Sequence, residues 1–187
     1  MTDDRAFPVM PRIGVSIAVL AMMAAVYASN LLVEIPINDW LTWGAFTYPV
    51  TFLVTDLTNR QYGPARARMV VYAGFVLGVA LSVVAADWRI GLASGTAFLV
   101  AQLVDIWLFD RLRRSGWWRA PLASSVLGST LDTALFFSLA FAGTGLPWIT
   151  WGAGDLGVKL LMAATLLAPY RMAMAFLGWS WSPRPAA

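Results

Sequence analysis

The feature that most constrains this chain is a succession of six long apolar stretches separated by short polar segments. They cover residues 13–33, 41–58, 69–86, 90–109, 122–142 and 156–177. A helix rises about 1.5 Å per residue, so each stretch matches the roughly 30 Å hydrocarbon core of a bilayer. The sequence therefore predicts an all-α integral membrane protein, a bundle of six transmembrane helices in one domain over residues 1–187.

Composition supports a membrane environment. Of the 187 residues, 59% are hydrophobic and only 12% are charged, whereas about a quarter of an ordinary soluble domain is charged. A soluble chain of this size could not cover so much apolar surface with polar groups. The net charge of +3 does not indicate a nucleic-acid partner, because the basic residues lie in short clusters between apolar stretches.

The distribution of the basic residues predicts an orientation. Eleven of the thirteen lie in the two terminal segments and in the second and fourth connections, whereas Arg89 and Lys159 alone lie on the opposite side. Arginine and lysine are enriched in cytoplasmic loops. We therefore expect both termini to face the cytoplasm of a bacterial cell whose inner membrane the chain crosses several times.

The chain contains no cysteine and no histidine. Thiol chemistry and metal sites built on these ligands are therefore excluded, and we expect neither a metal nor a cofactor. Any group that handles protons must be a carboxylate, the lysine or a tyrosine.

Polar residues inside three of the apolar stretches mark the candidate site. An ionisable group near the bilayer centre costs on the order of 3 kcal/mol, so it needs a partner, a cavity or a function. Gln102 and Asp105 lie one helical turn apart, and a second stripe contains Ser125, Ser129 and Asp132. The third stripe surrounds Asp56 and consists of Thr51, Thr55, Thr58 and Asn59. Three such stripes predict one internal pocket.

Other interpretations remain open at this point. Asp56 has Arg60 one turn away and is as well explained by a structural ion pair. Residues 152–155 read Gly-Ala-Gly-Asp, the GxGD pattern of intramembrane aspartyl proteases. That chemistry needs a second aspartate at matched depth, and Asp132 is expected to lie deeper than Asp155.

Two long blocks of sequence resemble the bacterial queuosine precursor transporter family, formerly described as vitamin uptake transporters. The first reads Thr-Trp-Gly-Ala-Phe-Thr-Tyr-Pro over residues 42–49 and continues through Thr55-Asp56-Leu57-Thr58 to Tyr62-Gly63. The second contains Gln102-Leu103-Val104-Asp105, then Phe109-Asp110-Arg111-Leu112-Arg113, Trp117-Trp118 and Asp132-Thr133. Arg171 and Asn59 depart from the family pattern.

The resemblance implies a single transporter domain that takes up a 7-deazaguanine, such as 7-cyano-7-deazaguanine, and is not an enzyme. One carboxylate can accept the ring N–H and the exocyclic amine of such a base, and an amide can bind its carbonyl. We therefore expect Asp105 or Asp132 to bind this edge and Gln102 to complete it, with Ser129 beside them. Aromatic candidates for stacking are Phe46, Tyr48 and Trp107. Residues expected to line or gate the path are Asn30, Asp56, Arg60 and Lys159.

The sequence leaves two alternatives to an independent transporter. The chain could be the substrate-binding subunit of an energy-coupling-factor system, since two small-residue patterns that can dock a partner helix are formed by Ala21 with Ala25 and by Ala24 with Ala28. An intramembrane hydrolase at the GxGD pattern is the other. The partner of the chain could be a second copy of itself or a coupling module. Gly74 and Gly78 permit close contact between helices, either within one chain or between two chains.

Overall fold

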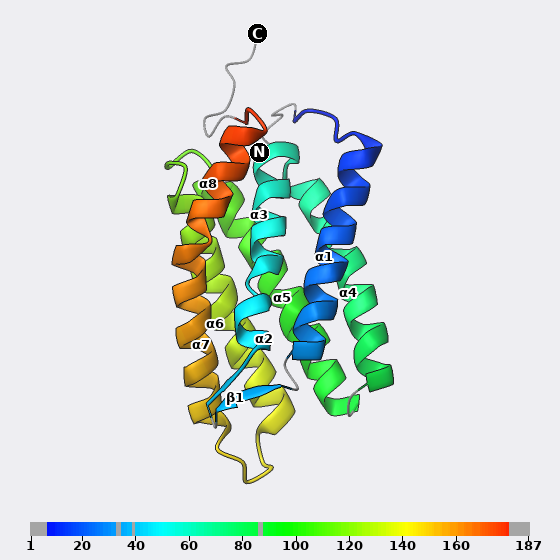
Figure 1. Ribbon diagram of the computed structural model, residues 1–187, viewed down its shortest axis with the longest axis vertical. Coiled ribbons are helices and arrows are strands. Elements are labelled where there is room, and N and C mark those ends of the chain that lie inside the picture. The colour runs from blue at the N-terminus through cyan, green and yellow to red at the C-terminus, as the bar shows by residue number, and fades with distance from the viewer. Residues whose placement is uncertain (1–6, 33–34, 39, 86–87, 180–187) are drawn as a thin grey trace.

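The computed structural model describes residues 7–32, 35–38, 40–85 and 88–179. They form an elongated helical bundle, in which a short two-stranded hairpin lies near one end (Figure 1). The helices are α1 (Arg12–Leu32), α2 (Gly44–Thr47), α3 (Val50–Tyr62), α4 (Pro64–Ala85), α5 (Trp88–Leu112), α6 (Arg119–Phe141), α7 (Trp148–Thr165) and α8 (Leu167–Phe176). Strands β1 (Pro36–Asn38) and β2 (Leu41–Thr42) pair antiparallel.

The outer surface of the bundle is apolar. Ile149 is 70% exposed and Phe176 is 91% exposed, and large exposed apolar side chains lie along α1, α5 and α7. Within the described residues, four stretches are long and apolar enough to cross a membrane: Arg12–Ser29, Trp88–Leu112, Arg119–Phe141 and Trp148–Phe176. An apolar exterior of this extent requires lipid as its solvent. The chain is an all-α, multi-pass membrane protein.

The bounds of several helices differ from those that the sequence predicted. The stretch 41–58 begins as strand β2, and its helical part ends four residues later than expected, at Tyr62. The stretch 69–86 begins five residues earlier, at Pro64, and the stretch 156–177 begins eight residues earlier, at Trp148. The predicted helix boundaries were placed at the ends of the apolar stretches. The helices continue beyond these points into polar or aromatic residues, which an apolar stretch does not include.

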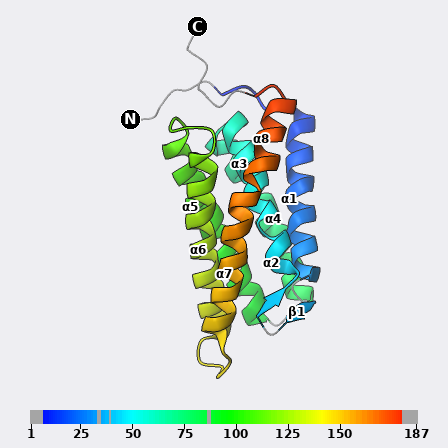
Figure 2. The ribbon, with the colours of Figure 1, turned by 60° about the vertical axis from the view of Figure 1, so that its left-hand side comes forward.

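Two of the long helices are interrupted, and each interruption lies near a proline. Pro49 separates α2 from α3. Pro169 lies in the first turn of α8, where it cannot donate the hydrogen bond that the Thr165 carbonyl would accept in a continuous helix. The chain therefore breaks between α7 and α8 at Leu166. The two helices follow one another along the length of the bundle (Figure 2).

The beginning of α1 and the end of α8 lie at the same end of the bundle, as do the end of α3 and the end of α5 (Figure 1). This end carries the arginine clusters of the second and fourth connections, and we refer to it as the arginine-rich end. The β1–β2 hairpin lies at the opposite end. Gly74 packs inside the chain, because a Cβ atom there would lie 2.5 Å from Met22 Cγ on α1.

Candidate functional site

A column of polar side chains follows α3 through the interior of the bundle. From the hairpin end toward the arginine-rich end it contains Tyr48, just before α3, and then Thr51, Thr55, Asp56 and Arg60 within the helix. All but Tyr48 are buried. The column spans about 18 Å at 1.5 Å per residue, over half of a bilayer core. Three groups of side chains meet it.

The first group, the ion-pair centre, contains Tyr48, Asp132, Thr133, Asp155 and Lys159. Lys159 Nζ lies 2.7 Å from Asp132 Oδ2 and 2.6 Å from Asp155 Oδ2. The Tyr48 hydroxyl donates to Asp132 Oδ1 at 2.7 Å, and Thr133 Oγ1 donates to Asp155 Oδ2 at 2.8 Å. Lys159 is 4% exposed. Each oxygen of Asp132 therefore has a strong donor, and α6 and α7 are joined to the start of α3.

The second group is a pair of buried aspartates, Asp56 on α3 and Asp105 on α5, which we call the carboxyl pair. The Asp105 side chain lies against Asp56 and Ser124. Ser124 and Ser125 donate to the two oxygens of Asp56, each at 3.3 Å. Asp105 is fully buried, and neither of its oxygens has a hydrogen-bond partner among the described residues.

The unpartnered oxygens of Asp105 make this pair chemically distinct. A buried polar atom without a partner costs about 1–3 kcal/mol, and a charged one costs more. Ser129 Oγ on the next turn of α6 is also buried without a partner. Unsatisfied groups in a membrane interior indicate a ligand or a proton that the protein itself does not supply.

The third group joins α3 to α5 through an amide. Gln102 Nε2 donates to Thr51 Oγ1 at 2.9 Å, and Thr55 Oγ1 donates to Gln102 Oε1 at 2.6 Å. All three side chains are fully buried. Gln102 therefore uses both ends of its amide to hold two helices together in this conformation.

A small pocket lies beside the carboxyl pair, between the two interrupted helices. Asp56, Ser125 and Ser129 supply its polar lining. Pro49 lines it from the α2–α3 break, and Leu166 and Leu167 line it from the α7–α8 break. Its volume of about 20 Å³ accommodates roughly one water molecule. Interrupted helices that flank a polar pocket near the middle of the membrane are typical of secondary transporters.

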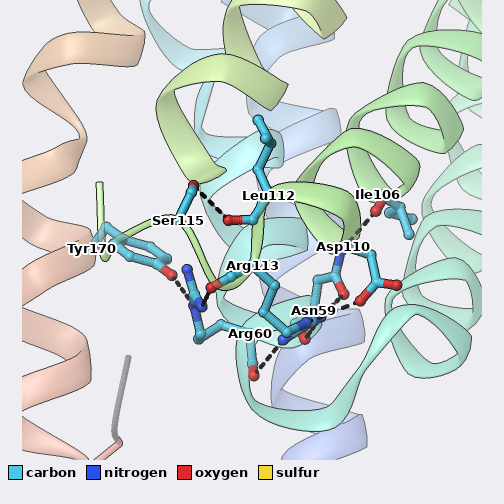
Figure 3. Close-up of polar contacts among 8 residues, drawn as sticks. All are labelled: Asn59, Arg60, Ile106, Asp110, Leu112, Arg113, Ser115 and Tyr170. Atoms are coloured by element: carbon cyan, nitrogen blue, oxygen red, sulfur yellow. Dashed lines mark hydrogen bonds and ion pairs between the residues drawn. The ribbon is translucent and has the colours of Figure 1, made fainter. Parts of the chain in front are cut away.

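The arginine-rich end of the column is closed by a reciprocal contact that we call the arginine clamp (Figure 3). Arg60 Nη1 donates to the Arg113 carbonyl at 2.8 Å, and Arg113 Nη1 donates to the Arg60 carbonyl at 2.9 Å. Arg113 Nη2 also bonds Asn59, and Arg60 Nε donates to the Tyr170 hydroxyl at 2.8 Å. Each guanidinium thus satisfies carbonyls at the C-terminal end of the other helix.

The structure brings most of the predicted residues together, but in two groups and not in one pocket. Asp105, Asp56, Ser129 and Gln102 lie along the α3–α5–α6 contact, whereas Asp132 pairs with Lys159 and Tyr48 farther toward the hairpin end. Asp56, Ser125 and Ser129 line the small pocket and Gln102, Asp105 and Asp132 do not, so the convergence of three polar stripes on one cargo site stays a prediction. Asp56 does not pair with Arg60, which bonds Arg113 and Tyr170.

The three remaining site candidates do not join these interior groups or have a side chain outside the described residues. Phe46 is partly buried on α2, 6.1 Å from the Trp43 ring. Trp107 is 53% exposed on the outside of α5, where the Arg111 guanidinium lies 5.1 Å from its ring, so it does not join the interior group. Asn30 lies in α1, but its side chain is outside the described residues.

Sequence patterns missed several interior residues. Asp155 was expected at the mouth of a helix, but it lies in the second turn of α7, one turn before Lys159. The i,i+4 spacing of Asp155 and Lys159 was the signal that could have revealed this pair. Tyr170, which follows Pro169, is 1% exposed and lines the pocket. Gly154 of the GxGD pattern allows α7 to pack closely on the turn at Trp40, because a Cβ atom on Gly154 would lie 2.9 Å from the Trp40 carbonyl oxygen.

A multi-pass helical bundle with two interrupted helices, an ionisable interior and a small polar pocket defines a membrane transporter as the class of protein. Comparison with known families gives the same result: the model described as "Putative vitamin uptake transporter" matches residues 42–87 and 82–173. The chain belongs to this family.

Relatives of known name agree with the family. The chain is 32% identical to the "Queuosine precursor transporter" of Escherichia coli over 79% of this chain and 80% of the relative. It is 33% identical to the "Probable queuosine precursor transporter" of Haemophilus influenzae over 76% of this chain and 78% of the relative. No solved structure matches the chain.

Proposed function

We propose that this chain imports a queuosine precursor, a 7-deazaguanine such as 7-cyano-7-deazaguanine, across the bacterial inner membrane. The observation that carries this proposal is the buried carboxyl pair beside the pocket. Asp105 offers two acceptor oxygens that have no hydrogen-bond partner within the part of the chain that the structure describes. The ring N–H and exocyclic amine of a guanine-like edge are two parallel donors, which such a carboxylate can accept together.

The proposal includes a topology. The helices α1, α2–α3, α4, α5, α6 and α7–α8 cross the membrane six times as one transporter domain over residues 1–187. Both termini face the cytoplasm, so the arginine-rich end is the cytoplasmic end. This orientation follows the preference of arginine for cytoplasmic loops. Cargo then enters from the hairpin end and leaves past the arginine clamp.

Named residues receive roles in this scheme. Asp105 and Asp56 bind the donor edge of the base, and Ser129 adds a hydroxyl from α6. Gln102 positions α3 against α5 and contacts the cargo only when its bonds to Thr51 and Thr55 open. Tyr48 and Phe46 supply aromatic faces near the hairpin end. The ion-pair centre of Asp132 and Lys159 gates the entrance, and Arg60 gates the exit.

Transport requires the pocket to enlarge. Its volume of about 20 Å³ is far smaller than a fused two-ring base. The two helix breaks that line the pocket are the natural points of movement, because a broken helix can bend without losing additional backbone hydrogen bonds. The conformation described here is therefore closed around the carboxyl pair.

The test is uptake in a bacterium that cannot make the precursor and lacks its own importer. Cells expressing this chain receive a low external concentration of 7-cyano-7-deazaguanine, and queuosine is measured in their tRNA. We expect restoration by the wild type and a loss of at least tenfold in Asp105→Asn. A wild-type protein that reaches the membrane and restores nothing would refute this cargo.

The same cells separate the alternatives. A substrate-binding subunit would restore uptake only when an ATPase module is present and would purify with it. An intramembrane hydrolase would depend on Asp155 for proteolysis and would not restore queuosine. An independent transporter restores queuosine without either activity.

A further inference from the structure

We infer that the carboxyl pair of Asp56 and Asp105 holds one proton and that this proton crosses the membrane together with the cargo. The inference rests on the proposed function, because the cargo is what couples to the proton. It adds a proton-binding site and an energy source to that function.

The first step of the argument is the arrangement of donors and acceptors. Asp56 is 2% exposed and Asp105 is fully buried, and their side chains lie against each other. Serine hydroxyls supply hydrogen to both oxygens of Asp56, at 3.3 Å, whereas neither oxygen of Asp105 has a hydrogen-bond partner among the described residues. Two ionised carboxylates in contact repel each other strongly in a membrane interior, and one shared proton removes both the repulsion and the missing donor.

The second step is the absence of a compensating cation at this pair among the described residues. Arg60, one turn along α3, bonds Tyr170 and the Arg113 carbonyl. Lys159 is held by Asp132 and Asp155 at the ion-pair centre. Of the elements packed around the pair, α8 contributes Tyr170 as a titratable group that faces Asp56. Helix α6 presents serines to the pair, and the membrane-spanning parts of α1 and α4 carry no charged residue. A bound proton can therefore supply the positive charge that the Asp56–Asp105 pair needs.

The third step connects the proton to the cargo. A carboxyl pair with one proton offers acceptor oxygens and one O–H donor. A guanine-like edge presents two N–H donors beside a carbonyl acceptor, so the singly protonated pair complements the whole edge. Without the proton, the carbonyl of the cargo would meet a second negative charge. The protonated pair therefore binds cargo, and one proton and one cargo molecule move inward in each cycle.

A second unpartnered group supports the location. Ser129 is 1% exposed, its Oγ has no hydrogen-bond partner among the residues that the structure describes, and it lines the same pocket as Asp56. Ser129 and Asp56 thus line the pocket together with Pro49 and Leu166 of the two helix breaks, and Asp105 lies against Asp56. This is the part of the bundle where movement would expose a bound proton to one side of the membrane and then to the other.

The coupling is tested with the purified full chain in sealed proteoliposomes. Exchange of labelled 7-cyano-7-deazaguanine for unlabelled cargo at equal pH on both sides reports transport itself. An acidic outside and a neutral inside should then drive transient accumulation above equilibrium, and a protonophore should abolish it. In exchange at equal pH, the apparent affinity should fall up to about tenfold per pH unit once the pair loses its proton.

The shared proton is tested separately by infrared spectroscopy of the wild type without cargo. A carbonyl band of a protonated carboxylic acid should persist at neutral pH and disappear in both Asp56→Asn and Asp105→Asn. The matched control is Asp110→Asn on the same helix, since Asp110 is 32% exposed and pairs with Arg113. That control should keep the band.

The outcomes separate the two proposals. Exchange without any effect of the pH gradient overturns the coupling and leaves the proposed function intact. A spectrum without the carboxylic acid band overturns the shared proton, whatever the cargo. Failure of exchange by a protein that shows the band overturns the cargo and, with it, the coupling.

Discussion

Two acidic groups lie on the same polar column and differ in one respect, the presence of a cation. The ion-pair centre places Lys159 between Asp132 and Asp155, and every oxygen of Asp132 has a donor. Within the described part of the chain, the carboxyl pair has serine hydroxyls as donors to Asp56 and no donor to Asp105. The comparison teaches that a buried aspartate in a membrane protein is structural where the chain supplies its counter-charge, and points to a ligand where it does not.

The largest expected effect comes from removing the cation of the ion-pair centre. Lys159→Met leaves two carboxylates without their partner, and breaking a buried ion pair from one side costs about 3–5 kcal/mol. Thermal unfolding in detergent should show a large loss of stability. The matched control adds Asp132→Asn and Asp155→Asn to the same chain and should recover most of it. An unchanged unfolding temperature in Lys159→Met would remove the contrast between the two groups.

The next effect falls on transport rather than stability. Asp105→Asn should reduce cargo uptake at least tenfold while it changes the free energy of unfolding by less than about 1 kcal/mol, because the asparagine amide can donate to Asp56 the hydrogen that the shared proton supplies in the wild type. Asp132→Asn should lower both uptake and stability, since it breaks bonds to Tyr48 and Lys159. Uptake by proteoliposomes and unfolding curves measure the two quantities. Equal stability losses in the two variants would refute the distinction.

A smaller effect is expected between the two groups, at Gln102. Gln102→Leu removes its bonds to Thr51 and Thr55 and should destabilise the protein by about 1–2 kcal/mol. Thr55→Val removes one of those bonds and should cost less, which makes it the graded control. Unfolding in detergent measures both. If Gln102→Leu instead abolished uptake at full stability, its amide would contact cargo directly.

The patterns in the sequence anticipated the fold better than the site. Apolar stretches identified the membrane environment and the approximate places of the helices, and the polar stripes correctly selected Asp105, Ser129 and Gln102 as interior residues. Sequence spacing could not reveal that Lys159 would reach Asp132, which lies 27 positions earlier, because that contact depends on how α6 and α7 pack. It also could not reveal that Tyr170 turns inward, because the break before Pro169 changes the face that α8 presents.

The smallest effect concerns the packing that holds the ion-pair centre in place. Gly154→Ala should cost about 1 kcal/mol or slightly more, because the new methyl group would lie 2.9 Å from the Trp40 carbonyl oxygen. Gly157→Ala on the same helix meets nothing within 4 Å and should stabilise the protein by up to about 1 kcal/mol. Opposite shifts in the unfolding temperature are the expected result. Shifts of the same sign would show that α7 does not pack closely on the hairpin.

The arginine clamp has a consequence for how the bundle can open. Because Arg60 and Arg113 each donate to the other's carbonyl, separating α3 from α5 at this end must break both bonds at once. Partial separation would remove both of these bonds simultaneously while the other contacts of the two arginines remain, so intermediate openings are disfavoured and this end has two preferred positions. A single-molecule distance measurement across it should therefore record abrupt steps between two separations, with few dwell times in between.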